Sequence, residues 1–174
     1  SAEPLLDEGG TVVGFSRGEP TFEHERLQHV AVDVGDPTSV AKGFRPIAKE
    51  HGRLDLVVNN AAVLTSQHAM IMPAQNARAM VDTNLLGTFL VSREAAKIMR
   101  KAKTGRIVNI GSMAASLEPM GDSLYAACKA AISTLAGVLA KEFGTFGVTC
   151  NTLAITAIET DMLNQLPREK IDEI

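Results

Sequence analysis

The sequence predicts an α/β protein built on a doubly wound parallel sheet, with residues 1–174 in one domain. Short runs rich in β-branched residues alternate along the chain with longer segments of helical periodicity. The strand-like runs are almost continuously apolar, which is typical of strands that helices cover on both faces of a parallel sheet. Right-handed connections between such strands place the helices in layers on the two faces of the sheet.

The first two strands are predicted from short apolar runs. TVVGF occupies residues 11–15, and VAVDV occupies residues 30–34. Both runs have the length and the valine content of buried strands.

The first long helix is predicted within residues 35–52 from its start and stop signals. Asp36 can cap the helix, and Pro37 suits its first turn. Gly52 is well placed to end the helix. Pro46 lies inside this segment, where a proline removes one hydrogen bond of the helix, so a kink or a break is expected there.

The rest of the chain repeats the alternation of strand and helix. The predicted elements are a strand within residues 54–61, a long helix within residues 73–105 that stops at Gly105, a strand over residues 106–112, a helix within residues 122–147, a strand over residues 148–155, and a polar, partly helical tail over residues 159–174.

The composition argues against several classes of function. A formal net charge of −3 offers no basic surface for nucleic acid or an anionic membrane. Trp is absent, and aromatic residues make up only 4% of the chain, which weakens any case for a base-stacking platform. The sequence has no apolar run near the roughly 20 residues of a membrane span, and its acidic start is unlike a signal peptide.

Cysteine and histidine usage points to a cytoplasmic protein with no metal site. Cys128 and Cys150 lie in apolar segments and form no CxxC pair, so we expect buried, reduced thiols. The four histidines lack the spacing of a ligand set. They are His24, His29, His51 and His68.

Polar and small residues collect where the predicted strands end. They are Ser16-Arg17, Asp33-Val34, residues 59–62 (NNAA) and Gly111-Ser112. Because ligands of open α/β sheets bind beyond the carboxyl ends of the strands, this clustering is a functional signal. The alternative is that turn residues simply gather at strand ends.

Tyr125 and Lys129 lie one helical turn apart on the same helix face. A fixed positive charge beside a phenol lowers its pKa, so Tyr125 is expected to exchange a proton with a substrate oxygen. Ser112 ends the preceding strand and faces the same crevice, where its hydroxyl could bind that oxygen. Asn84, in an apolar stretch of helix, needs a partner, which could be a water or a backbone group leading to Lys129.

Each of these four residues also has a structural explanation. A Tyr and a Lys four apart occur on many surface helices, and the serine and the asparagine suit a turn and a cap. The set of four, in order and at one edge of the predicted sheet, favours a catalytic site.

These residues resemble those of the short-chain dehydrogenase/reductase family. The matching pieces are DV at residues 33–34, NNAA at 59–62, TNLLGTF around Asn84, NIGS ending in Ser112, YAACK at 125–129 and IETDM at 158–162. The resemblance implies a Rossmann-type three-layer sandwich. It implies Tyr125 as the general acid/base, Lys129 as the group that lowers its pKa, Ser112 as the substrate-carbonyl ligand and Asn84 as the support of a proton-relay water.

The resemblance also implies a nicotinamide cofactor. The residues expected to bind it are Asp33 and Val34 at the adenine, Asn60 and Ala61 at the adenosine ribose, Tyr125 and Lys129 at the nicotinamide ribose, and Ile158 and Thr160 at the carboxamide and phosphate. Ser16 and Arg17 offer a hydroxyl and a cation to a 2′-phosphate, so NADP(H) is expected rather than NAD(H). Three nearby acidic residues oppose this preference: Glu19, Glu23 and Glu25.

One family feature is missing from the sequence. No glycine-rich phosphate loop opens a helix, because the glycines of GGTVVG (residues 9–14) precede and interrupt a strand. By resemblance, the chain starts inside the first helix of the fold and lacks the central first strand as well as the strand and helices after Ile174. Unpaired strand edges would remain inside the sheet. We therefore expect these residues to be part of a longer protein.

The sequence favours an NADPH-dependent carbonyl reductase, closest to the 3-oxoacyl-[acyl-carrier-protein] reductase branch. The alternatives are a dehydrogenase of a small alcohol, a sugar or a steroid, and a non-catalytic nucleotide-binding scaffold on the same fold. The expected substrate is a small carbonyl compound or alcohol, which could be linked to an acyl carrier protein. The other expected partners are further copies of the chain, in a homodimer or homotetramer.

Overall fold

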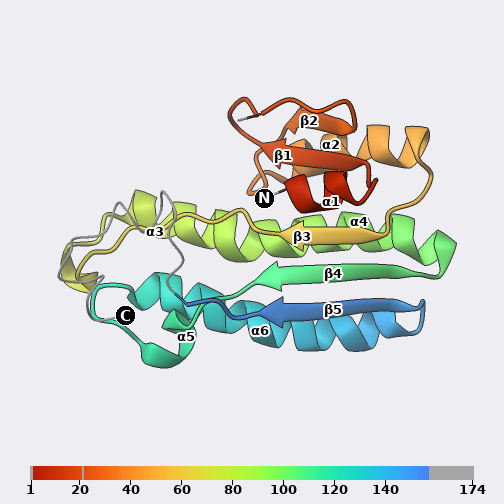
Figure 1. Cartoon of the computed structure of the whole chain (residues 1–174). Helices are drawn as coiled ribbons and strands as arrows, with labels where there is room; N and C mark the ends of the chain where they lie inside the picture. The colour runs from red at the N-terminus through yellow and green to blue at the C-terminus, as the bar shows by residue number, and fades with distance from the viewer. Residues whose placement is uncertain (1, 21, 157–174) are drawn as a thin grey trace.

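The computed structural model describes residues 2–20 and 22–156. In this part of the chain, every strand runs parallel to its neighbours. The strands are β1 (Val12–Ser16), β2 (Leu27–Ala31), β3 (Leu56–Asn59), β4 (Gly105–Ile110) and β5 (Val148–Leu153). β1 pairs with β2, and β3, β4 and β5 form a second sheet with β4 in the middle (Figure 1).

β1 and β3 each keep one edge unpaired within the described residues. Figure 1 shows β3 on the side of β1 away from β2, with both strands pointing the same way. The two sheets therefore form one sheet that is interrupted between β1 and β3. An α/β fold with parallel strands is therefore confirmed, and among the described residues no strand lies between β1 and β3. The interruption lies at the position where the central first strand was expected.

Helices lie on both sides of this sheet. They are α1 (Glu3–Asp7), α2 (Pro37–Glu50), η1 (Ala69–Ile71), α3 (Ala74–Met80), η2 (Val81–Gly87), α4 (Thr88–Ala102), α5 (Ala114–Leu117) and α6 (Ser123–Gly144). In Figure 1, α2, α4 and α6 lie behind the strands, and α1 lies in front of them.

One hydrophobic core joins the three long helices to both sheets. Val40 of α2, Leu90 of α4 and Leu139 of α6 belong to the same buried cluster as Val57 and Ile107 of the strands. The core therefore continues across the interruption, although the backbone hydrogen bonds do not. In the described residues, no strand pairing joins β1–β2 to β3–β5, and the shared hydrophobic core connects the two sheets.

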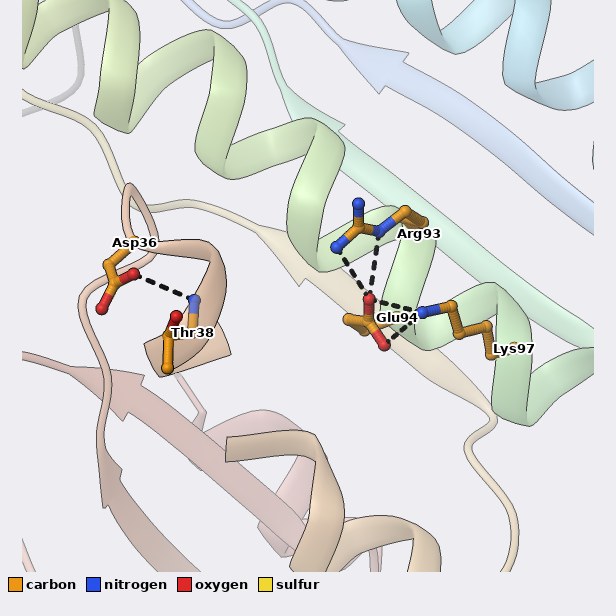
Figure 2. A network of polar contacts seen from close by, with 5 residues as sticks. All are labelled: Asp36, Thr38, Arg93, Glu94 and Lys97. Carbon is orange, nitrogen blue, oxygen red and sulfur yellow. Dashed lines mark hydrogen bonds and ion pairs between the residues drawn. The ribbon is translucent and has the colours of Figure 1, made fainter. Parts of the chain in front are cut away.

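The helix α2 begins as its sequence predicts. The carboxylate of Asp36 accepts a hydrogen bond from the backbone N–H of Thr38 at 2.9 Å (Figure 2). It accepts a second one from the backbone N–H of Ser39 at 3.2 Å. Gly52, with a φ of +65°, follows the helix end. The helix continues through Pro46 to Glu50, so the expected break is absent.

The strand β2 starts and ends three residues earlier than predicted. Its register is fixed by β1, from Val12 beside Leu27 to Ser16 beside Ala31. After Val32, the Asp33 carboxylate accepts a hydrogen bond from the N–H of Gly35 at 2.9 Å, which turns the chain away. The polar residues at the start of β2 hid its true beginning, because an edge strand does not need an apolar residue at every position.

The predicted long helix over residues 73–105 divides into α3, the π-helical segment η2 and α4. It ends at Lys103, which has a φ of +53°, and Gly105 instead begins β4. A Cβ atom on Gly105 would collide with the side chain of Met99. The glycine is therefore needed for close packing of strand against helix. No pattern in the sequence predicted the short helix α5.

The helix α6 is long and apolar enough to cross a membrane by length and composition, with 22 residues and a mean hydropathy of 1.4. It is also a core helix, packed against β5 and η2. Core helices of α/β proteins often have this composition. Its buried polar residue Lys129 belongs to the candidate site.

Candidate active site

The candidate site lies at the carboxyl ends of β3 and β4, beside the first turns of α6. Ser112 follows β4, and Tyr125 lies in α6. The two side chains share a hydrogen bond. The Ser112 hydroxyl oxygen also accepts the N–H of Ala114 at 3.1 Å, which holds the serine at the start of the following turn. The structure thus brings together the serine and the tyrosine expected to share one substrate oxygen.

Lys129 lies one turn after Tyr125 and is only 3% exposed. Its Nζ atom donates a hydrogen bond to the carbonyl oxygen of Ile110 at 2.7 Å and lies 5.6 Å from the centre of the Tyr125 ring. Burial lowers the pKa of this ammonium, and the neighbouring Cys128 opposes that shift. The carbonyl of Ile110 at the end of β4 fixes the ammonium beneath the phenol.

The acidity of Tyr125 differs from the expectation. Burial raises the pKa of the phenol above its ordinary value of 10.0, the hydrogen bond with Ser112 lowers it, and the charge of Asp122 raises it further. The expectation of a Tyr125 pKa below its ordinary value is therefore wrong for this structure, because the causes that raise it outweigh those that lower it. Desolvation penalises the phenolate more than the described partners stabilise it.

Asn84 is fully buried in the π-helical segment η2. Its amide nitrogen donates to the carbonyl oxygen of Val63 at 2.9 Å, and its amide oxygen accepts the N–H of Val63 at 2.8 Å. The asparagine therefore holds the chain that follows β3. Its partner is the backbone of Val63, and its expected connection to Lys129 through a proton-relay water or a backbone group stays a prediction.

The expected cofactor residues lie along one edge of the sheet. Ser16 ends β1, Arg17 follows it and is exposed, and Asp33 is exposed in the turn after β2. Val34, in the same turn, is half-buried. Asn60 and Ala61 are exposed in the segment after β3. Ile158 and Thr160 lie outside the described residues.

The structure adds polar residues that the sequence reasoning missed. The amide of Asn59 donates to the Ser92 hydroxyl at 2.9 Å and to the amide oxygen of Asn109 at 2.8 Å. These groups tie β3, α4 and β4 together directly below the site. Buried asparagines at strand ends were the available signal, because such groups need partners. Asp122 was missed because its distance from the phenol depends on the turn before α6.

A nicotinamide cofactor fits part of this edge. The exposed Arg17 and Asp33 offer a cation and an acceptor where the adenosine end was expected, and Lys129 has further N–H groups near Tyr125. Gly9 has a φ of +89° and follows the end of α1. As predicted, this glycine precedes a strand and does not open a helix. Among the described residues, no glycine-rich turn opens a helix for the pyrophosphate.

Comparison with known proteins places the chain among relatives of one kind. The family model described as short chain dehydrogenase matches residues 2–171. The chain is 31% identical over 175 residues to 3-oxoacyl-[acyl-carrier-protein] reductase FabG of Vibrio cholerae, covering 97% of this chain and 72% of that relative. The 3-oxoacyl-[acyl-carrier-protein] reductase of Synechocystis is 34% identical over 142 residues, which are 82% of this chain and 58% of the relative.

Two solved structures are similar to this fold. The ligand-free aldohexose dehydrogenase of Thermoplasma acidophilum has a TM-score of 0.88 and 29% identity, over 94% of this chain and 63% of that chain. ElxO with NADP bound has a TM-score of 0.86 and 29% identity, over 99% of this chain and 72% of that chain. The chain thus spans about two thirds of the length of these relatives.

Proposed function

Because the chain belongs to the short-chain dehydrogenase family of NAD(P)-dependent oxidoreductases, we propose that it reduces a carbonyl compound with NADPH. The observation that carries the proposal is the arrangement of Ser112, Tyr125 and Lys129. A hydrogen-bonded serine and tyrosine lie at the carboxyl end of the sheet, with a buried ammonium fixed one helical turn along.

In the proposed reaction, Tyr125 supplies the proton. The Ser112 hydroxyl donates a hydrogen bond to the carbonyl oxygen of the substrate and holds it beside the phenol. The bound nicotinamide supplies the hydride to the carbonyl carbon. The Tyr125 O–H bond breaks as its proton passes to the oxygen, which gives an alcohol, and the phenolate then takes a proton from solvent.

The acidity of Tyr125 suits the direction of reduction. A phenol whose pKa lies above 10.0 stays protonated at neutral pH, so its proton is available to the substrate. Lys129 stabilises the phenolate that forms in the reaction, because its charge lies 5.6 Å from the ring. In the proposal, the other N–H groups of Lys129 hold the hydroxyls of the nicotinamide ribose.

Two observations support NADPH over NADH. Arg17 places an exposed guanidinium at the carboxyl end of β1, where it suits a 2′-phosphate. The similar structure of ElxO has NADP bound.

For the substrate, we propose a 3-oxoacyl group, delivered by an acyl carrier protein. The similar reductases of Vibrio cholerae and Synechocystis carry this substrate in their names. Exposed apolar side chains flank the site and suit an acyl chain. They are Met113 (36% exposed), Leu117 (57%) and Met120 (82%), between Ser112 and Tyr125.

A sugar such as an aldohexose is the second candidate, because the similar aldohexose dehydrogenase structure has a TM-score of 0.88. The proposal further includes a cytoplasmic location and a homodimer or homotetramer that uses α4 and α6. The exposed face of α6 carries small residues such as Ala127, Ala130 and Gly137, which permit close helix packing.

The test replaces the proton donor. Tyr125→Phe keeps the ring and removes the hydroxyl, so NADPH affinity in isothermal titration is expected to stay within about 3-fold of the unchanged protein. Reduction of a 3-oxoacyl thioester is expected to fall by about 100- to 10,000-fold, the usual contribution of a general acid. Undiminished turnover by Tyr125→Phe contradicts the assigned role.

Two further results separate the alternatives. Oxidation of aldohexoses in preference to reduction of 3-oxoacyl thioesters would favour the second candidate. NADPH binding with no turnover on a panel of ketones, thioesters and sugars would instead support a nucleotide-binding scaffold.

A further inference from the structure

The end of β1 contains a contact that the resemblance does not assign. The Oγ atom of Ser16 lies 2.6 Å from the carbonyl oxygen of Gly18 and 2.8 Å from the Nε2 atom of His29. His29 belongs to the neighbouring strand β2, beside Gly14 in the register. A residue of β2 thus contacts the turn that carries Arg17.

The chemistry of these partners fixes the direction of both hydrogen bonds. A carbonyl oxygen only accepts, so the Ser16 hydroxyl donates its proton to Gly18. The remaining lone pairs of Ser16 accept the N–H of His29, which therefore carries a proton on Nε2. Because the Ser16 hydroxyl proton is already donated to Gly18, it is not available to a phosphate. Ser16 therefore links the turn to β2 and takes the place of the direct phosphate donor that the sequence predicted.

The surrounding charges favour an anion at Arg17. His29 also lines an open cavity of about 540 Å³, together with the carboxylates of Glu23 and Glu25. Two carboxylates disfavour an anion inside that cavity. The anion is instead expected at the exposed guanidinium of Arg17, which lies on the turn that Ser16 and His29 hold.

We propose that His29 is a positioning residue for cofactor specificity: through Ser16, it holds the Ser16–Gly18 turn so that Arg17 is presented to the 2′-phosphate of NADPH. This inference rests on the proposed function, because it concerns the cofactor of the same site. It predicts that a change at His29 alters the affinity for NADPH but not for NADH, because NADH has no 2′-phosphate.

The experiment measures the dissociation constants of NADPH and NADH by isothermal titration of the full-length protein. His29→Leu removes the N–H donor and is expected to weaken NADPH binding by about 3- to 10-fold, which is the usual effect of one lost hydrogen bond. The dissociation constant of NADH is expected to stay unchanged. His29→Gln keeps an N–H donor and is expected to restore most of the NADPH affinity. Ser16→Ala is expected to match His29→Leu.

A double variant tests the route of the effect. If His29 acts through Ser16, the Ser16→Ala, His29→Leu protein is no weaker toward NADPH than either single variant. His24→Asn is the matched control, since it removes an imidazole from the same cavity but keeps an acceptor for the N–H of Arg26. It is expected to leave both dissociation constants unchanged.

The possible outcomes distinguish this inference from the proposed function. If the unchanged protein prefers NADH or binds neither nucleotide, the proposed cofactor and this inference both fail. If it prefers NADPH and His29→Leu weakens both nucleotides equally or neither, only the role of His29 fails. Thermal melts of each variant show whether a loss of affinity comes from unfolding.

Discussion

At the scale of single residues, the acidity of Tyr125 is set by its surroundings. Burial and the carboxylate of Asp122 raise the pKa of the phenol, and Ser112 opposes them. Asp122 is only 6% exposed and precedes the first residue of α6, so its charge acts through little solvent. This buried carboxylate adds to the larger effect of burial in raising the pKa of the phenol.

Removing that charge is expected to shift the pH dependence of catalysis. Asp122→Asn takes away a negative charge that disfavours the phenolate, so the pKa of Tyr125 falls. In the direction of alcohol oxidation, the phenolate is the base, and the rate rises with pH through this pKa. The rising limb of the kcat/KM profile is expected to move to lower pH in Asp122→Asn and to stay in place in Asp122→Glu, which keeps the charge.

Asn84 contributes to stability through both atoms of its amide. Asn84→Ala leaves the N–H and the carbonyl of Val63 without their partner, at a cost of about 2–3 kcal/mol. Urea unfolding measures this change in the free energy of unfolding. Asn151→Ala, at an exposed position of β5, is the control and is expected to cost under about 1 kcal/mol. Equal costs for the two variants would show that the Asn84 contacts do not stabilise the protein.

At the scale of elements, α4 carries a charged cluster on its outer side. Figure 2 shows Glu94 between Arg93 and Lys97, with its carboxylate oxygens 3.0 Å from the guanidinium and 2.7 Å from the ammonium. Burial alone would raise the pKa of Glu94, but the hydrogen bonds and charges of Lys97 and Arg93 lower it below 4.5. The Glu94 side chain is 12% exposed, whereas its partners are 42% and 62% exposed.

The depressed pKa of Glu94 predicts a pH-dependent contribution to stability. A group whose pKa is lower in the folded state stabilises that state above its unfolded pKa, and the stabilisation is lost as the pH falls through the folded value. Because the partners are solvated, Glu94→Gln is expected to cost about 0.5–1 kcal/mol at pH 7. In urea unfolding, the cost is expected to shrink as the pH falls below 4.5 and to vanish once Glu94 is protonated in the folded protein as well. Glu142→Gln, at an exposed position of α6, is the control and is expected to show no such dependence.

At the scale of the whole molecule, the sheet is interrupted between β1 and β3 within the described residues. Leu56 and Val58 of β3 are 37% and 46% exposed, and Leu153 of β5 is 57% exposed. These side chains alternate with the buried ones that face α4 and α6. The described residues thus leave apolar positions of the sheet uncovered on the face opposite the long helices.

Hydrogen exchange of single amides tests this interruption. The N–H of Val12 donates to the carbonyl oxygen of Arg26, the residue before β2. Because N–H groups alternate in direction along a strand, the amides of Val13 and Phe15 face the free edge. We expect these two to exchange faster than Gly14, by 10-fold or more.

The central strand β4 provides the comparison for this experiment. Because β4 has partners on both sides, the amides of neighbouring residues such as Ile107 and Val108 are both expected to exchange slowly. Protection of Val13 and Phe15 equal to that of Gly14 would mean that another segment pairs with β1.

The sequence alone determined which residues form strands and helices and which side chains could carry chemistry. Apolar runs and capping residues are local signals, so α2, α6 and most of every strand except β2 were predictable. Ser112, Tyr125 and Lys129 were predictable because parallel strands end at one edge, and because residues four apart share a helix face.

Only the tertiary structure decided the environment of each group. The pKa of Tyr125 depends on its burial and on Asp122, Gly105 serves helix packing and not helix termination, and His29 meets Ser16 across two strands. These outcomes depend on distances between segments that are far apart in the chain. Desolvation and hydrogen bonding change steeply over a few ångströms, and no local pattern in the sequence encodes such distances.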